Sequence, residues 1–482
     1  MPLVMASLCV NAQTFTVLHT FTNTPDGANP YSGGGMVLSD NTLFGTACQG
    51  GSSGHGVVFS VHTDGTDFGI LYNFTGGSDG SFPAAGLVLS GNNLYGTTLL
   101  GGTNGSGVVF AVTTNGSNFT VLHSFAATTP SITSAQPNTI VTNIDGACPY
   151  GELLLLDNRL YGTTSLGGSN ASGTAFSLNT DGTDFNVLHS FAVNGYAANG
   201  NFGVGTNSDG FYSTAGLVSL GGMLYGTTSV GGTNQNGVVF AMSTNGSNFT
   251  VLHTFAASTF PAVRNLEGRW PYGLVLSSNI LYGATSSGGS KLNGTVFSLY
   301  TNGTTFTLLH NFTSSEGNGG ANLSVVGNKL YGPRTQSGPN GSGMVFSLNT
   351  DATGFKILYG FSAKGNNGTN TDGAYTTSSL VLAGNTLYGA PQQGGSQGFG
   401  TVFALQLPLI ISGIVANPDD SVTLDFMGTP YLTFLVQATT NLLSQSSWQT
   451  IATNVAGVNG SWQCIDTNAN NYPSRFYRST IP

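Results

Sequence analysis

Three short motifs recur along the chain at fixed intervals, and this repetition restricts the fold more than any other feature of the sequence. A Leu-aromatic-Gly motif has its aromatic residue at Phe44, Tyr95, Tyr161, Tyr225, Tyr282, Tyr331 and Tyr388. A Gly-x-Val-Phe-like motif ends at Phe59, Phe110, Phe176, Phe240, Phe297, Phe346 and Phe403. A third motif, Phe-x-x-Leu-His-x-Phe with Tyr in place of two of the His residues, starts at Phe15, Phe68, Phe119, Phe185, Phe249, Phe306 and Phe355.

The intervals between these motifs predict short antiparallel strands. The first and second motifs are 15 residues apart in all seven copies, and the second and third are 9 residues apart wherever the third follows. Pairs such as Asp64-Gly65 and Asn115-Gly116 in the 9-residue joint predict hairpin turns with positive φ at both residues. A further strand such as 86–89 precedes each aromatic-Gly motif. Four-stranded units repeated in this way are typical of β-propeller blades.

The ends of the repeat region predict a closed ring. A copy of the third motif at residues 14–21 precedes every other strand, whereas no such copy follows Phe403. We therefore expect residues 14–21 to complete the last blade, which leaves no long sheet edge unpaired. The predicted fold is all-β, a seven-bladed β-propeller over residues 13–407 closed by an N-terminal strand.

The two ends of the chain differ from the repeats. Residues 1–12 form a short apolar run ending in Val-Asn-Ala, which we interpret as a signal-peptide remnant cleaved after Ala12. Residues 408–482 alternate as strands around 422–426, 434–438, 448–451 and 475–478, and they predict a small fibronectin-III-like β-sandwich.

The repeated motifs resemble the GloVer-type tandem repeat of exported bacterial proteins. The resemblance covers residues 13–405 and depends on the order Gly-Leu-Val-Leu, Leu-Tyr-Gly-Thr-Thr, Gly-Gly, Gly-Val-Val-Phe. It implies a secreted, extracellular protein and assigns no chemistry. A C-terminal anchoring segment is common in such proteins, and we do not expect one in the closing residues Arg475 to Pro482.

Charge and composition argue against several classes of partner. The formal net charge is −9 with only ten Lys and Arg, so nucleic acid and anionic membranes are not expected as partners. The sequence contains no run of about 18 apolar residues, so we do not expect the chain to insert into a membrane. The spacing of the cysteines along the chain matches neither a disulfide framework nor a zinc site. We expect a monomer with no metal and no cofactor.

Loop lengths point to one functional face. The length differences between repeats fall in the loop that joins the third motif to the next first strand, and in a propeller this loop shares a face with the loop before the second motif. One acid per repeat follows the variable loop, at Asp26, Asp79, Asp145, Asp209, Glu267, Glu316 and Asp372. These acids could form a carboxylate ring that binds a cation or a sugar. Alternatively, each could accept hydrogen bonds from backbone N–H groups at a turn. The turn role is favoured because the acid occurs in every repeat, whereas a binding site needs asymmetry.

The repeated histidines predict packing rather than chemistry. His19, His123, His189, His253 and His310 occupy one position of the third motif, where Tyr72 and Tyr359 stand in the other copies. A residue at this place in a strand lies on the same face as the flanking Phe residues. We therefore expect these side chains to pack between blades.

One departure from the repeat predicts a ligand site on the loop-rich face. Basic residues are rare in the chain, yet four of them lie in loops of blades five and six beside two acids and the only Trp of the repeats. An aromatic face with Arg, Lys and carboxylate groups suits a sugar. The candidate ligand-binding residues are Arg264, Glu267, Arg269, Trp270, Lys291, Glu316 and Arg334.

Two functions follow from this cluster. The first is an extracellular, non-enzymatic binding or surface-interaction module that recognises a polysaccharide, another surface polymer or a cell-surface ligand. The alternative is a secreted carbohydrate-active enzyme, a polysaccharide lyase or glycoside hydrolase, whose carboxylates would be Glu267 and Glu316. Gly394 to Gly398 matches Gly-x-Ser-x-Gly, but no strand-to-helix elbow is expected there, so this match indicates no nucleophile.

Overall fold

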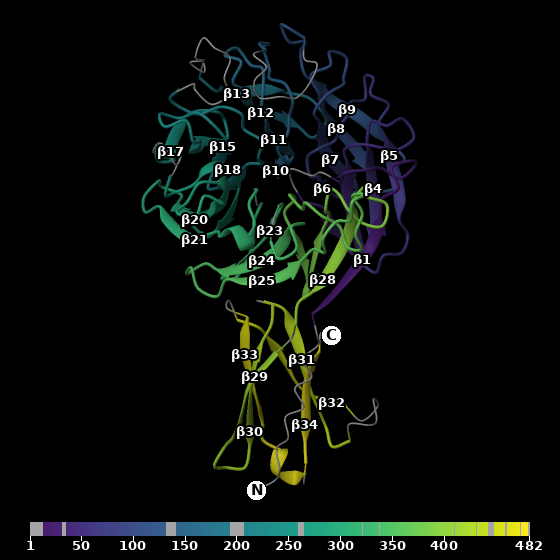
Figure 1. The fold of residues 1–482 in the computed structure, drawn as a ribbon, viewed down its shortest axis with the longest axis vertical. Helices are drawn as coiled ribbons and strands as arrows, with labels where there is room; N and C mark the ends of the chain where they lie inside the picture. The colour runs from purple at the N-terminus through teal and green to yellow at the C-terminus, as the bar shows by residue number, and fades with distance from the viewer. Residues whose placement is uncertain are drawn as a thin grey trace.

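The structure is a computed structural model of an all-β chain in which four-stranded antiparallel sheets follow one another, and a smaller β-domain comes after them (Figure 1). It describes residues 13–30, 35–131, 141–192, 207–258, 265–320, 322–336, 338–408, 410–429, 431–441, 448–457, 460–472 and 474–480. The expected signal-peptide remnant, 1–12, lies outside the described residues. Within the described part, no helix has the length and apolar character needed to cross a membrane.

Seven four-stranded sheets make up the larger part, and we number them one to seven in chain order. Their first strands are β2 (Val37–Ser39), β6 (Val88–Ser90), β10 (Leu154–Leu156), β14 (Val218–Leu220), β18 (Arg269–Ser277), β22 (Ser324–Val326) and β26 (Val381–Ala383). Their second strands are β3 (Thr42–Ala47), β7 (Asn93–Thr98), β11 (Arg159–Thr163), β15 (Met223–Thr228), β19 (Ile280–Ser287), β23 (Lys329–Arg334) and β27 (Thr386–Gly389).

The third and fourth strands carry the remaining two motifs. The third strands are β4 (Val57–His62), β8 (Val108–Thr113), β12 (Thr174–Asn179), β16 (Val238–Ser243), β20 (Thr295–Tyr300), β24 (Met344–Asn349) and β28 (Thr401–Gln406). The fourth strands of sheets one to six are β5 (Gly69–Asn73), β9 (Phe119–Ser124), β13 (Asn186–Ser190), β17 (Thr250–Thr254), β21 (Thr307–Asn311) and β25 (Lys356–Gly360).

The fourth strand of sheet seven comes from the start of the chain. β1 (Thr14–Thr20) pairs antiparallel with β28, with Thr14 opposite Gln406 and Thr20 opposite Thr401. The sheet therefore has the order β1-β28-β27-β26. This is the pairing expected for residues 14–21.

The constant interval of 15 residues has a packing explanation. The glycine after each motif aromatic lies opposite the Phe of the third strand, as Gly96 does with Phe110. A Cβ added to Gly96 would stand 2.7 Å from the ring of Phe110, which is too close for any larger residue. The aromatic ring thus covers the glycine, and neither residue can move along its strand without losing this contact.

The hairpin turns differ from the prediction. Gly65 has a φ of 86°, but Asp64 does not have a positive φ. The Asp64 side chain instead accepts a hydrogen bond from the backbone N–H of Thr66 at 2.9 Å, and the N–H of Gly65 donates to the carbonyl of His62. The prediction of positive φ at both residues was wrong because the Asp side chain stabilises a longer turn with a single left-handed glycine.

The C-terminal part contains two three-stranded sheets. One has the order β29 (Ile410–Ala416), β30 (Val422–Met427), β33 (Ser461–Asp466), and the other the order β32 (Gln449–Val455), β31 (Thr433–Thr439), β34 (Phe476–Thr480). Trp462 stacks on Phe426 at 5.0 Å and on Phe434 of the other sheet at 4.1 Å. Two short 3-10 helices complete the described elements, η1 (Ser314–Glu316) and η3 (Ala469–Asn471).

Candidate functional site

Two sets of loops meet at one end of the seven sheets, which we call the loop face. Single bridges join the loop before a first strand to the loop before a third strand, as in Ser81 with Leu100 and Ala374 with Gln393. In sheet five the longer strands β18 and β19 replace this bridge, with Arg269 opposite Ser287. The variable loop therefore lies beside the loop before the third strand of the same sheet, as the sequence predicts.

The repeated acids bind the repeated histidines and tyrosines. His Nε2 or Tyr Oη lies 2.7–3.2 Å from a carboxylate oxygen in all seven sheets. The pairs are His19–Asp26, Tyr72–Asp79, His123–Asp145, His189–Asp209, His253–Glu267, His310–Glu316 and Tyr359–Asp372.

Each acid also accepts a backbone N–H just after the fourth strand, for example from Ala126 to Asp145 at 3.0 Å. Each His or Tyr ring stacks on the Phe that starts the third motif of the next sheet, as His19 does on Phe68 at 3.5 Å. The repeated acids thus fix the turn into the variable loop, and the rings fill the space between sheets.

This network reassigns two of the predicted ligand-binding residues. Glu267 is held by His253 at 3.1 Å and Glu316 by His310 at 3.2 Å. The hydrogen bond from His253 is the main cause that lowers the pKa of Glu267, which outweighs the opposite effect of burial. A carboxylate with a lowered pKa inside a turn is a poor general acid, so Glu267 lacks a feature that the hydrolase alternative requires.

The four basic candidates have separate places. Arg264 lies outside the described residues. Arg334 is 0% exposed, and it donates to the carbonyls of Asn293 and Gly317 while lying over the ring of Phe312. Its prediction as a ligand-binding residue was wrong, because a fully buried side chain cannot meet a ligand at the surface. Lys291 is exposed in the loop before β20.

Trp270 and Arg269 lie beside a cavity of about 520 Å³ on the loop face. We call it the amide pocket, because its walls carry aromatic, amide and hydroxyl groups and no carboxylate among the described residues. The Arg269 guanidinium lies 4.3 Å from the centre of the Trp270 ring, which is 40% exposed. The polar and aromatic lining residues are Trp270, Tyr272, Ser286, Ser287, Asn318, Thr335, Gln336, Tyr375, Thr377, Gln392 and Gln393.

A missing side chain in sheet six opens this pocket. The residue after each loop bridge is Asn29, Phe82, Cys148, Tyr212 and Tyr375 in sheets one, two, three, four and seven, so each of these sheets has a side chain there. In sheet six the same position, after Asn318, is Gly319. The amide pocket therefore lies between Trp270 of sheet five and Tyr375 of sheet seven, where the intervening sheet has no ring.

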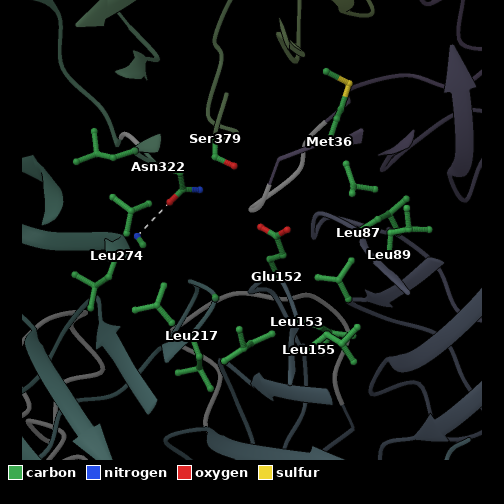
Figure 2. Close-up of a pocket in the computed structure, with 18 residues that line it drawn as sticks. Met36, Leu87, Leu89, Glu152, Leu153, Leu155, Leu217, Leu274, Asn322 and Ser379 are labelled. Carbon is green, nitrogen blue, oxygen red and sulfur yellow. Dashed lines mark hydrogen bonds between the residues drawn. The ribbon is translucent and has the colours of Figure 1, made fainter. Parts of the chain in front are cut away.

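The sequence analysis did not anticipate a second cavity, of about 510 Å³, between the first strands of the sheets. Figure 2 shows Glu152, Asn322 and Ser379 directed into it from a wall of leucines. Glu152 is the one charged residue among the described residues that line it. Burial raises the pKa of Glu152 to about 7, although its carboxylate accepts a hydrogen bond from the backbone N–H of Gly35.

These three polar residues occupy one repeated position. Nine residues before the motif aromatic stand Gly35, Gly86, Glu152, Gly216, Gly273, Asn322 and Ser379. Neighbouring sheets approach closely here, since a Cβ on Gly216 would lie 2.9 Å from the carbonyl oxygen of Glu152. Sequence reasoning could have found Glu152 by aligning the seven repeats on their motif aromatics, because Glu152 is the one charged residue at this repeated position.

The described residues contain no group of three or more His, Cys, Asp or Glu side chains arranged to hold a metal ion. Among the described residues, Cys48, Cys148 and Cys464 form no disulfide, and burial raises the pKa of the Cys148 thiol to about 12.

The fold and the two cavities define an all-β repeat protein with a loop face. Its sequence matches the Gloeobacter/Verrucomicrobia repeat over residues 4–212, 139–268 and 212–409. The chain belongs to this family of repeat proteins. No curated protein matches the sequence.

Several solved structures are similar to this chain at low sequence identity. Oligogalacturonate lyase from Vibrio parahaemolyticus is 9% identical with a TM-score of 0.47, covering 84% of this chain and 99% of that one. A puromycin-hydrolysing peptidase of Mycobacterium tuberculosis is also 9% identical with a TM-score of 0.46, covering 85% of this chain and 62% of that one.

Proposed function

We propose that this protein is an extracellular, non-enzymatic binding module that recognises carbohydrate through the amide pocket. The observation that carries the proposal is the half-exposed Trp270 ring at the edge of a 520 Å³ cavity lined by amides and hydroxyls. This volume falls within the roughly 300–1,000 Å³ of ligand pockets in general.

The chemistry of the walls suits a saccharide. Sugar C–H faces pack on indole and phenol rings, while side-chain amides donate and accept hydrogen bonds with hydroxyl groups. Lys364 lies over the Tyr375 ring at 4.0 Å and Arg269 over Trp270 at 4.3 Å. Two cations at the edge of a pocket without a carboxylate favour a neutral or anionic sugar over a cationic one.

The enzyme alternative has less support in the geometry. A glycoside hydrolase of the usual kind needs two carboxyl groups about 5–9.5 Å apart. Glu267 and Glu316 are held by His253 and His310. The second cavity, between the first strands, has Glu152 as the one carboxylate among its described lining residues. Glu152 has a pKa suited to proton transfer near neutrality, so product release must be assayed together with binding.

The wider architecture in this proposal is a closed ring of seven blades. The seven four-stranded sheets and the pairing of β1 with β28 support it. We further propose that residues 408–482 form a fibronectin-III-like domain, that residues 1–12 are a signal-peptide remnant, and that the mature protein is a secreted monomer.

A polysaccharide array tests the function. Wild type, Trp270→Ala and the matched control Phe82→Ala, which changes the corresponding loop position of sheet two, are assayed for retention and for release of reducing ends. We expect retention of wild type and Phe82→Ala without new reducing ends, and loss of retention for Trp270→Ala. Reducing-end release that is lost in Glu152→Gln would instead identify an enzyme, and equal retention of all variants would reject the amide pocket.

A further inference from the structure

A small cavity lies between sheet six and the C-terminal part, away from the loop face. Its volume is about 140 Å³, and we call it the junction pocket. Lys329, Tyr331, Ser347, Lys356 and Leu358 line it from β23, β24 and β25. The remaining lining residues are Leu407, Pro408, Met427, Gly428 and Thr429.

Strand register brings two lysines to this pocket. Tyr331 lies opposite Ser347 and Ser347 opposite Lys356, so these residues form one row across the sheet. Lys329 precedes Tyr331 by two residues and therefore lies on the same face. The chain has only four lysines, at 291, 329, 356 and 364, and two of them meet here.

Neither lysine has a carboxylate partner among the described residues. The ion pairs that Arg or Lys form there are Arg159 with Asp184 and Arg475 with Asp466. Burial lowers the pKa of Lys329, and the charge of Lys356 lowers it further. Lys329 is half-buried and Lys356 is exposed, and an anion between their ammonium groups would offset the repulsion between them.

A hydroxyl group supplies an independent observation. Thr429 is 4% exposed, and its Oγ1 has no hydrogen-bond partner among the residues that the structure describes. A buried hydroxyl without a partner costs roughly 1–3 kcal/mol. Thr429 lines the same cavity as the two lysines, so a group with several acceptor oxygens could satisfy the hydroxyl and both cations together.

We propose that the junction pocket binds a small oxyanion, a sulfate or phosphate group, between the ammonium groups of Lys329 and Lys356 and the hydroxyl of Thr429. The cavity exceeds the roughly 30 Å³ share of one water molecule, yet it is below the roughly 300 Å³ at which pockets for larger ligands begin. It thus has room for one such group. Because it is lined by both parts of the chain, the bound anion joins the repeat region to the C-terminal part.

Calorimetric titration and thermal unfolding with inorganic sulfate and inorganic phosphate test this site. Sodium chloride at matched ionic strength controls for screening, and Lys291→Met, at an exposed lysine that lines neither the junction pocket nor the amide pocket, controls for the loss of one positive charge elsewhere. We expect saturable binding and a rise in Tm for wild type and Lys291→Met. Lys329→Met and Lys356→Met should each weaken binding at least tenfold, and Thr429→Val should weaken it about threefold to tenfold.

A third titration, with methyl sulfate, separates two sources of the oxyanion. Affinity similar to that of sulfate identifies the monoester group of a larger molecule as a ligand, and binding of the inorganic ions alone identifies the free ion; both support the site. Stabilisation by sulfate that only follows ionic strength overturns the proposal, as does binding that Lys329→Met, Lys356→Met and Thr429→Val all leave unchanged. Because Trp270 lies on the loop face, glycan retention on the array is read independently of these titrations.

Discussion

Phe15 and Tyr359 stack face to face, with ring centroids 4.0 Å apart and planes 8° from parallel, although they come from opposite ends of the repeat region. Phe15 belongs to β1 in sheet seven and Tyr359 to β25 in sheet six. The same contact joins His19 to Phe68 and Tyr72 to Phe119 in successive sheets. The first strand of the chain therefore takes the place of the fourth strand that sheet seven lacks.

A designed disulfide tests this pairing. Thr16 and Ala404 are opposite residues of β1 and β28, and Cα atoms of opposite antiparallel residues lie about 4.5–5.5 Å apart, which suits a disulfide. In a background with the native cysteines replaced, Thr16→Cys/Ala404→Cys should oxidise to an intrachain crosslink, seen as faster migration on a non-reducing gel. The control Thr16→Cys/Ser298→Cys, with its second cysteine in sheet five, should stay reduced; the opposite pattern would contradict the pairing.

Substitution of His19 by Tyr should change how stability depends on pH. Burial is the main cause that lowers the pKa of His19 below 6.5, and it outweighs the opposing effect of Asp26. The unfolded chain therefore takes up this proton first, and stability is lost as the pH falls below about 6.5. His19→Tyr, which copies Tyr72 and Tyr359, should reduce the loss of stability between pH 8 and pH 5.

Urea unfolding at a series of pH values measures this effect. The reciprocal variant Tyr72→His serves as the control, because it adds a titrating ring at the same position of the next sheet and should steepen the dependence. Identical slopes for wild type and His19→Tyr would show that the His19–Asp26 pair does not contribute to acid sensitivity.

Glu152→Gln should stabilise the protein at alkaline pH. The folded-state pKa of Glu152 is about 7, raised by burial above its ordinary 4.5. Its contribution to stability is full below pH 4.5 and is lost as the pH rises through 7. The amide should therefore raise the free energy of unfolding at pH 8 by about 1–3 kcal/mol, with little change at pH 4.5.

Denaturant curves at the two pH values check this expectation. Ser379→Ala, which changes an uncharged residue at the same repeated position, should have the same effect at both pH values. Equal effects of Glu152→Gln at pH 4.5 and pH 8 would show that this carboxyl group does not titrate abnormally in the cavity.

The strands were predictable because each motif carries its own physical reason. The interval from Tyr95 to Phe110 follows from the Phe ring that covers Gly96, and the packing role predicted for the histidines is confirmed by the stacking of His19 on Phe68. The strands β29 and β33 were not anticipated, since short alternating segments in a small sandwich have no repeat to support them.

The candidate site was only partly predictable. The sequence directed attention to Trp270 because a single Trp breaks the repetition, and the structure places it beside the amide pocket. Glu267 and Glu316 looked like ligand groups because their His partners, at positions 253 and 310, were assigned to packing alone. Arg334 was unpredictable, since its burial depends on the carbonyls of Asn293 and Gly317, which only the folded loops bring together.

The most direct test of the account is a calorimetric titration of Trp270→Ala with an oligosaccharide cut from the polymer that the array retains. We predict one binding site in wild type and in Phe82→Ala, and an affinity at least tenfold lower in Trp270→Ala, because loss of the indole removes the stacking surface. Equal affinity of all three proteins, each folded by circular dichroism, would contradict the assignment of the amide pocket as the carbohydrate site.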